Sequence, residues 1–221
     1  MTGQETNHSI TNPDETGDAM DSAWRRYADA PPEDKRQAIV EAAARVFKAR
    51  GLAGASMRLI AREAGCTTGA IYPHFGGKES LYAEVLAQSL HALYASVRQA
   101  IHEAATEDKG RAGLRAFYDY YRVHPLELSL GLYLYQGARP VGLTRDLNHS
   151  LNRSLESVFR IMTDALRTSG HDLPEVRCTD GVAHAVGVLI LNQTGRMKVL
   201  DREPDEQMAF YLESLRGRRT D

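Results

Sequence analysis

Hydroxyl, aromatic and basic side chains gather in one short stretch of the chain, which runs from Ser56 to Lys78. The hydroxyl groups of Ser56, Thr67 and Tyr72 and the ammonium group of Lys78 are suited to contacts with phosphate oxygens. Such contacts position a protein on a nucleic acid without reading its sequence. The chemistry that these residue types indicate is therefore binding to a polyanion.

Two short helices joined by a tight turn are predicted to position these side chains. Ser56 is expected to cap a first helix over 57–64, and Thr67 a second helix from Thr68 to about Phe75. Gly65 between them allows the chain to reverse through a left-handed backbone conformation. This is a helix-turn-helix, in which one helix crosses the DNA backbone and the other offers its N-terminal residues to the major groove.

The predicted DNA contacts all lie in or beside this pair of helices. Small residues early in the second helix would let it approach the bases closely, and hydroxyl and basic groups would bind the backbone. The residues are Ser56, Arg58, Thr67, Thr68, Gly69, Ala70, Tyr72, Pro73, His74 and Lys78.

The stretch resembles the DNA-binding domain of the TetR family of bacterial transcriptional regulators. The family pattern runs approximately Thr/Ser-x-x-x-Ile-Ala-x-x-Ala-Gly-Val-Ser-x-Gly-x-hydrophobic-Tyr-x-His-Phe, followed after a short gap by Lys-Glu/Asp-x-Leu. The chain supplies in register Ser56, Ile60, Ala61, Ala64, Gly65, Thr67, Gly69, Ile71, Tyr72, His74, Phe75, Lys78, Glu79 and Leu81. The apolar helix pattern before this motif also fits, so the resemblance covers about Lys35 to Val85.

Two positions depart from the family pattern. Cys66 stands where Val is frequent, as a small apolar substitute that is either a redox sensor or a buried, inert thiol. No basic residue adjoins it in sequence, which favours the inert thiol. Pro73 lies inside the predicted second helix, has no N–H to donate to the carbonyl of Gly69, and is expected to bend the last turn.

Composition and charge argue against several other classes of protein. The chain has 221 residues, 43% hydrophobic and 25% charged, which is typical of a globular protein. No apolar run approaches the ~20 residues of a membrane-spanning helix. The first residues, 1–21, are acidic and polar rather than a signal peptide, and two distant cysteines favour a reducing cytoplasm. The net charge is −2, but the segment from Glu33 to Ser80 holds eight Lys or Arg against five Asp or Glu.

The predicted architecture is all-α, with three parts. These are a mobile acidic extension over 1–32, a helix-turn-helix domain over 33–80, and a helical effector-binding and dimerisation domain over 81–221. The resemblance implies the same division. The extension contains Trp24, Arg25 and Arg26; the two arginines either reach a minor groove as an arm or belong to a tail helix or a disordered tail.

One segment gives conflicting signals. Leucines alternate with other residues from Leu126 to Leu134, which is typical of a strand. A lone strand among helices would have no partner for its backbone groups, whereas a helix buried on several sides tolerates leucines all round. We therefore expect a helix.

Two groups of residues in the later part of the chain are candidates for binding a ligand and a second subunit. The first comprises Tyr118, Tyr121, Tyr133 and Tyr135, which either line a ligand cavity or are core and surface tyrosines, and Asn192, which either hydrogen-bonds a ligand or pairs across a subunit interface. The second lies on two amphipathic helices near the end of the chain that we expect to form a dimer interface. It comprises Ala183, Val186, Gly187, Leu189, Ile190, Met208, Tyr211, Leu212 and Leu215.

The chain contains no GxSxG motif, no glycine-rich phosphate loop and no close pair of histidines, so no catalytic residue, metal or cofactor is predicted. The predicted function is a cytoplasmic repressor. It binds a palindromic DNA operator as a homodimer and is released by a partly apolar small molecule, with no membrane partner. Alternatives are an activator or ligand-independent regulator of the same family, or a helical small-molecule-binding module without a DNA function.

Overall fold

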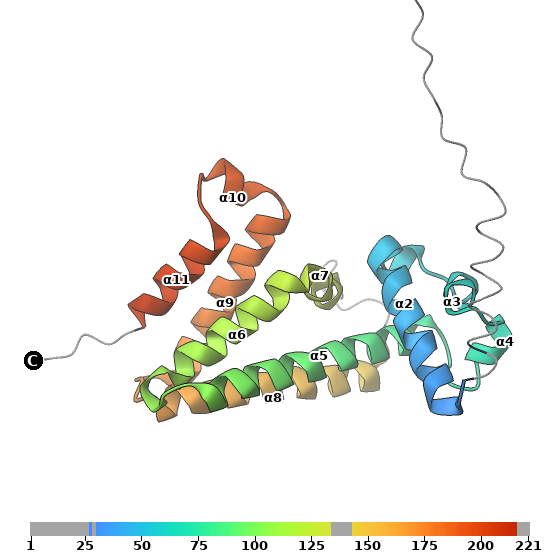
Figure 1. The fold of residues 1–221 in the computed structure, drawn as a ribbon, viewed down its shortest axis with the longest axis horizontal. Helices are drawn as coiled ribbons and strands as arrows, with labels where there is room; N and C mark the ends of the chain where they lie inside the picture. The colour runs from blue at the N-terminus through green and yellow to red at the C-terminus, as the bar shows by residue number, and fades with distance from the viewer. Residues whose placement is uncertain (1–26, 28–29, 134–142, 216–221) are drawn as a thin grey trace, which may run out of the picture. The chain divides into compact units, whose positions relative to one another are not determined.

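The computed structural model describes residues 27, 30–133 and 143–215, and within these ranges it contains helices and no strand (Figure 1). The expected all-α fold is therefore confirmed. The described residues belong to two compact units, Met1–Tyr82 and Ala83–Asp221, which meet within one long helix. Trp24, Arg25, Arg26, Leu134 and Tyr135 lie outside the described residues.

The first unit consists of α2 (Pro32–Gly54), α3 (Met57–Ala64), α4 (Thr68–Ile71) and the first residues of α5 (Lys78–Glu103). Pro32 opens α2, and two acidic residues follow it in the first turn, where the helix dipole favours negative charge. The helical backbone of α2 breaks at Gly51, whose φ is 65°. Glycine adopts this left-handed conformation readily, so the helix kinks at Gly51, and one further turn leads towards α3.

Apolar residues at helical spacing form the core of the first unit. Ile39, Phe47, Ile60 and Ile71 are each exposed by 1% or less. The ring of Phe47 meets that of Tyr82 edge to face, with centroids 5.1 Å apart. The core therefore joins α2, α3 and α4 to the beginning of α5 and fixes the two short helices.

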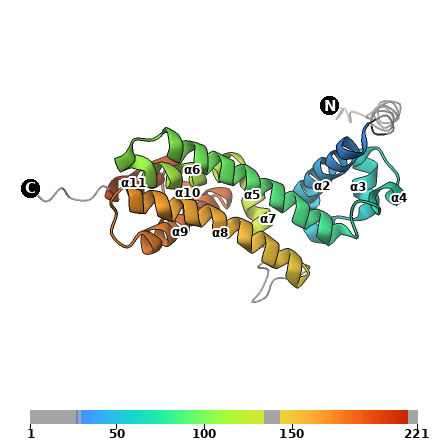
Figure 2. The same cartoon turned by 90° about the horizontal axis from the view of Figure 1, so that it is seen from below.

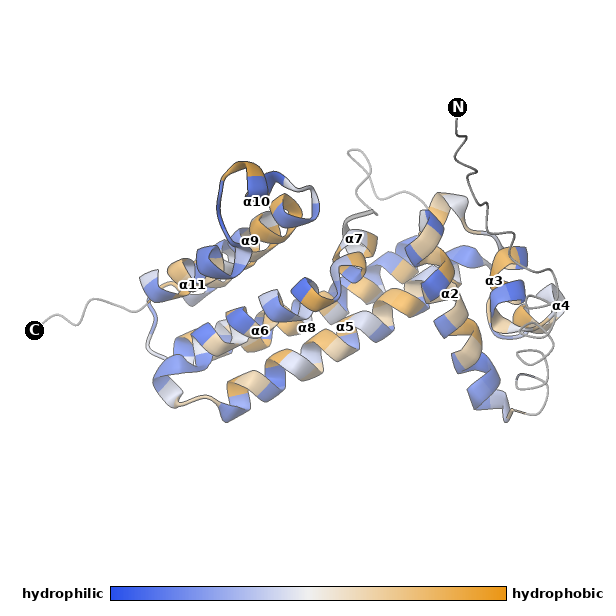
Figure 3. Ribbon diagram, turned by 45° about the horizontal axis from the view of Figure 1, so that its top comes forward, coloured by the Kyte–Doolittle hydropathy of each residue, from blue (hydrophilic) through white to orange (hydrophobic). Residues whose placement is uncertain are grey.

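The second unit contains the rest of α5 and the helices that follow it. These are α6 (Lys109–Val123), preceded by the 3-10 turn η1 (Thr106–Asp108), α7 (Pro125–Tyr133), α8 (Arg145–Thr168), α9 (Pro174–Gln193), α10 (Arg196–Val199) and α11 (Pro204–Ser214). Helix α6 contacts α7, α8, α9 and α11, and it runs beside α5 and α8 in Figures 1 and 2. Hydrophobic and hydrophilic residues alternate along these helices (Figure 3), as expected where one face of each helix is buried.

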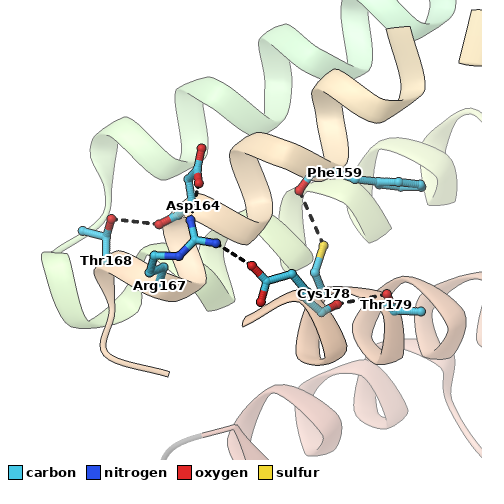
Figure 4. A network of polar contacts seen from close by, with 7 residues as sticks. Phe159, Asp164, Arg167, Thr168, Cys178 and Thr179 are labelled. Atoms are coloured by element: carbon cyan, nitrogen blue, oxygen red, sulfur yellow. Dashed lines mark hydrogen bonds and ion pairs between the residues drawn. The ribbon is translucent and has the colours of Figure 1, made fainter. Parts of the chain in front are cut away.

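Helices α6 and α8 of the second unit approach each other closely at Gly110. A Cβ added to Gly110 would lie 2.6 Å from Cδ2 of Leu166 and 2.9 Å from its Cα, so only glycine fits between α6 and the end of α8. Beside this contact, polar groups join α8 to α9 (Figure 4). Arg167 bridges Asp164 and Glu175, and the thiol of Cys178 donates to the carbonyl of Phe159 at 3.7 Å. Because Arg167 is about half exposed, its ion pairs orient the side chains that join α8 to α9 and add little to the free energy of unfolding.

The structure resolves the ambiguous leucine segment. Residues Pro125–Tyr133 form the helix α7, so the helical interpretation is confirmed as far as Tyr133. The short helix α10 was not predicted, because four residues are too few to show a helical period. None of the described helices is both long and apolar enough to cross a membrane.

Candidate nucleic-acid interface and ligand cavity

Side-chain caps fix the start of each short helix in the first unit. The hydroxyl oxygen of Ser56 accepts a hydrogen bond from the amide of Leu59 at 3.2 Å, and that of Thr67 accepts from Ala70 at 3.3 Å. Both caps satisfy amides that have no partner within their own helix. The helices α3 and α4 therefore begin at the residues that the sequence predicts.

The turn between the two helices depends on Gly65. Its φ is 69° and its ψ is 36°, the left-handed conformation that only glycine adopts without cost. The next amide, that of Cys66, donates to the carbonyl of Ala61 at 2.9 Å and closes the end of α3. Burial raises the pKa of the Cys66 thiol, which opposes formation of a thiolate and agrees with an inert role for this residue.

The second helix of the pair is shorter than expected. Helix α4 ends at Ile71, and Tyr72, Pro73 and His74 form a turn rather than a continuation to Phe75. Pro73 has no N–H to donate to the carbonyl of Gly69, so the regular helical hydrogen bonds end here. The amides of His74 and Phe75 both donate to the carbonyl of Ile71, at 2.9 and 3.0 Å, so the segment still turns in the same direction.

The predicted DNA-contact residues lie together on the outside of this unit, with the exception of Lys78. Tyr72 is 56% exposed although it is aromatic. Ser56, Arg58, Thr67, Gly69 and Pro73 are also exposed, and Thr68, Ala70 and His74 are half-buried. Beside them, a surface hollow of about 690 Å³ is lined by residues of α3 and the turn, including Arg58, Arg62, Thr67 and Thr68. Arg62 was not predicted, although it stands one helical turn after Arg58 on the same face.

The ammonium group of Lys78 is hydrogen-bonded within the first unit, a role that the predicted phosphate contact does not include. It donates to the carbonyl of Leu52 at 3.2 Å and to that of Ala55 at 3.5 Å. These two carbonyls lie at the end of α2 and just before α3. Two of the three ammonium donors are therefore used to join the start of α5 to the connection between the other helices.

The second unit contains an apolar cavity of about 170 Å³ between α5, α6, α7, α8 and α9. Leucine and aromatic side chains form most of its wall. Among the predicted ligand residues, Tyr121 lines it. Tyr118 is fully buried elsewhere and donates to a carboxylate oxygen of Asp205 at 3.0 Å, and Asn192 is exposed outside the lining. The side chain of Tyr133 lies outside the described part of the chain, as does Tyr135.

The polar residues of this cavity were not predicted. Ser89, Glu127, Asn148 and Asn152 line it beside the apolar groups. The sequence contains a pattern that could have indicated the two asparagines as a pair. They are four residues apart, on either side of Leu151, and so lie on one face of a helix whose other face is apolar. Glu127 stands alone among leucines, which is also an unusual position for a charged residue.

The predicted dimer residues divide into two groups. Leu189, Met208, Leu212 and Leu215 are buried in the core of the second unit. Ala183 and Ile190 are exposed, and Val186, Gly187 and Tyr211 are half-buried. Ala183 and Gly187 also line a shallow groove of about 260 Å³ with Met197 of α10 and with Leu200 just after that helix, which is 57% exposed. Only the second group can contribute surface to a partner.

Fold and surface together define a helical protein with an N-terminal helix-turn-helix domain. The sequence profile of bacterial regulatory proteins of the tetR family matches residues 39–85. The chain is 46% identical over 68 residues to the HTH-type transcriptional regulator SrpR of Pseudomonas putida, a match covering 31% of this chain and 32% of SrpR. It is 35% identical over 97 residues to the HTH-type transcriptional activator FasR of Mycolicibacterium smegmatis, covering 43% and 44%.

The similarity in fold covers a larger share of the chain than the similarity in sequence. The TetR family transcriptional regulator PfmR of Thermus thermophilus superposes with a TM-score of 0.61 at 20% identity, over 87% of this chain and 100% of PfmR. The N-terminal domain of the chain is therefore similar to that of the tetR family of bacterial regulatory proteins, and the fold of the chain is similar to that of PfmR. The matches of the chain to SrpR and FasR span less than half the length of either relative.

Replacing Lys78 by Met should destabilise the first unit by about 1 to 2 kcal/mol, because the carbonyls of Leu52 and Ala55 lose a charged donor. The matched control is Lys48→Met on α2, where the lysine is exposed. Thermal unfolding followed by circular dichroism compares the two. Equal midpoints for both variants would contradict the structural role given to Lys78.

Proposed function

We propose that the chain is a DNA-binding transcriptional regulator of the TetR type that acts in the cytoplasm. Its dimer binds a palindromic operator, and a small molecule bound in the second unit changes its affinity for that operator. The repressor mode, in which the ligand releases the DNA, is the primary form of the proposal. Since FasR is named an activator, activation is the alternative, and transcription of a reporter with the gene deleted separates the two.

The exposed aromatic ring of Tyr72 beside the capped start of α4 is the observation that carries this proposal. With 56% of Tyr72 exposed, more than half of this aromatic residue is accessible to a partner. Together with the small residues Gly69 and Ala70, it suits the major groove, where base edges and thymine methyl groups are accessible. Arg58 and Arg62 at the adjacent hollow are suited to the phosphate backbone.

The cavity of the second unit supports the effector part of the proposal. It is mostly apolar with a few polar groups, which is the usual character of small-molecule sites. A ligand there shifts the operator affinity only if it binds more tightly to one conformation of the protein than to another. Helix α5 contains residues of both units and lines the cavity with Leu86, Ser89 and Leu90, which supports it as the route of coupling.

The exposed part of α9 supports the dimer. Ala183 and Gly187 present little side-chain volume and would permit a close approach of two helices, and Ile190 adds apolar area. The exposed ring of Phe210 on α11, at 77%, is a further apolar group that the sequence prediction did not include. A two-fold axis would bring the same surface of each copy together.

Replacing Tyr72 by Ala should weaken operator binding by about tenfold or more, because one base contact contributes roughly 1 to 3 kcal/mol. The fold should be unaffected, since the ring is exposed. The operator is first selected from random duplexes with the unmodified protein, and binding is then followed by fluorescence anisotropy at several salt concentrations.

Tyr72→Phe is the matched control, because it keeps the ring and removes only the hydroxyl. The unmodified protein should show an affinity that falls steeply with log salt, as phosphate contacts require. Binding of Tyr72→Ala at the strength of the unmodified protein would argue against the assignment, and so would a failure to select any duplex.

Replacing Gly187 by Arg should convert the dimer into a monomer. A Cβ at Gly187 meets nothing within 4 Å in the protomer, so the larger residue fits the isolated chain but not a close helix–helix contact. Sedimentation velocity measures the mass, with Gln99→Arg on the exposed side of α5 as control. A Gly187→Arg protein that stays dimeric would place the interface elsewhere.

A further inference from the structure

The cavity of the second unit combines an apolar wall with a single carboxylate. We infer that its ligand is an organic amine in the protonated form, with an aromatic or alkyl body, and that Glu127 binds the ammonium group. This inference rests on the proposed function and deepens it, because it names the chemical class of the effector.

The size and wall of the cavity fit the body of such a ligand. Its volume of about 170 Å³ is close to the roughly 150 Å³ of an engineered apolar cavity that binds benzene. Leu90, Leu128, Leu151 and Leu155 contribute aliphatic surface on several sides. A body about as large as one benzene ring with a short alkyl chain is therefore the expected size.

The charge of the lining selects the head group. Among the lining residues that the structure describes, Glu127 carries the only formal charge, and none is Lys, Arg or His. A carboxylate or phosphate on the ligand would be taken out of water beside a negative charge, with no cation among the described lining residues to pair with it, which is costly. A cation placed there gains a charged partner instead.

Glu127 is held in a fixed position by its neighbours. Its Oε2 accepts hydrogen bonds from Oγ of Ser89 at 2.5 Å and from the hydroxyl of Tyr120 at 2.6 Å. For Oε1, the structure gives one polar neighbour in the described chain, Nδ1 of His124 at 3.5 Å. A carboxylate offers about four acceptor sites, so Oε1 retains capacity for a donor from the ligand.

Aromatic rings add a second feature that favours a cation. Phe117, Tyr121 and Phe159 all line the cavity. The ring of Phe117 lies 5.2 Å from that of Tyr121 and 6.4 Å from that of Phe159, measured between centroids. Ring faces attract ammonium groups, and the attraction grows when both partners are out of water. Carboxylate and rings thus favour the same class of ligand.

The test uses three compounds with one body and different head groups: phenylbutylamine, phenylbutanol and phenylbutanoate. Their binding to the full chain is measured by isothermal titration calorimetry near pH 7 in the absence of DNA. The amine should bind about tenfold or more tightly than the alcohol, as expected for a charge-assisted hydrogen bond, and the carboxylate should bind most weakly.

Glu127→Gln removes the charge and keeps an oxygen that can accept from Ser89 and Tyr120. In this variant the preference for the amine over the alcohol should fall to about twofold or less, while the alcohol keeps its affinity. Glu156→Gln on α8 is the matched control, because Glu156 is exposed and outside the lining. It should bind all three compounds as the unmodified protein does.

Three results would overturn the inference. They are a preference for the carboxylate, an amine preference that survives Glu127→Gln, and no measurable binding of any of the three compounds to the unmodified protein. Because the head-group series is measured on the unmodified protein, the test does not depend on folding of a variant. Operator binding by the same preparation without ligand tests the proposed function separately. A failure of the ligand inference is therefore distinguished from a failure of the proposed DNA-binding function.

Discussion

The left-handed backbone at Gly65 is the constraint on which the candidate DNA surface depends. At φ 69° it ends α3 and turns the chain within a few residues, so that Thr67 caps α4. A residue with a Cβ pays a steric cost in this conformation. The hydrogen bond from the amide of Cys66 to the carbonyl of Ala61 then holds the turn from the side of α3. The orientation of Tyr72 and of the first turn of α4 follows from this one reversal.

Much of this surface could be predicted from the sequence because its signals are local. A cap such as Ser56, a turn glycine such as Gly65 and a missing donor at Pro73 act on residues within four positions along the chain. These local signals do not indicate contacts between residues that are far apart along the chain. The bonds from Lys78 to the carbonyls of Leu52 and Ala55 join groups that are more than twenty residues apart, and no local pattern indicates them.

The second unit was less predictable for the same reason. The helical pattern predicted its long helices, and burial of Leu189, Met208 and Leu212 shows that amphipathic spacing does not distinguish an internal core from a subunit interface. The cavity depends on which faces of five helices meet. Tyrosines clustered near two predicted helices were candidates for its wall, with packing in the core as the alternative. Tyr118 packs elsewhere, and Glu127, a residue in a leucine-rich segment, carries the charge in the lining.

Hydrogen exchange of backbone amides with and without operator DNA tests most directly that the surface from Ser56 to His74 meets the duplex. Apart from the capped amides of Leu59 and Ala70, the first amides of α3 and α4 have no partner within their own helix, so we expect them to exchange quickly in the free protein. The regulator assignment predicts that peptides covering this segment exchange more slowly in the complex. A complex in which this segment exchanges as fast as in the free protein, with protection confined to residues of the second unit, would contradict it.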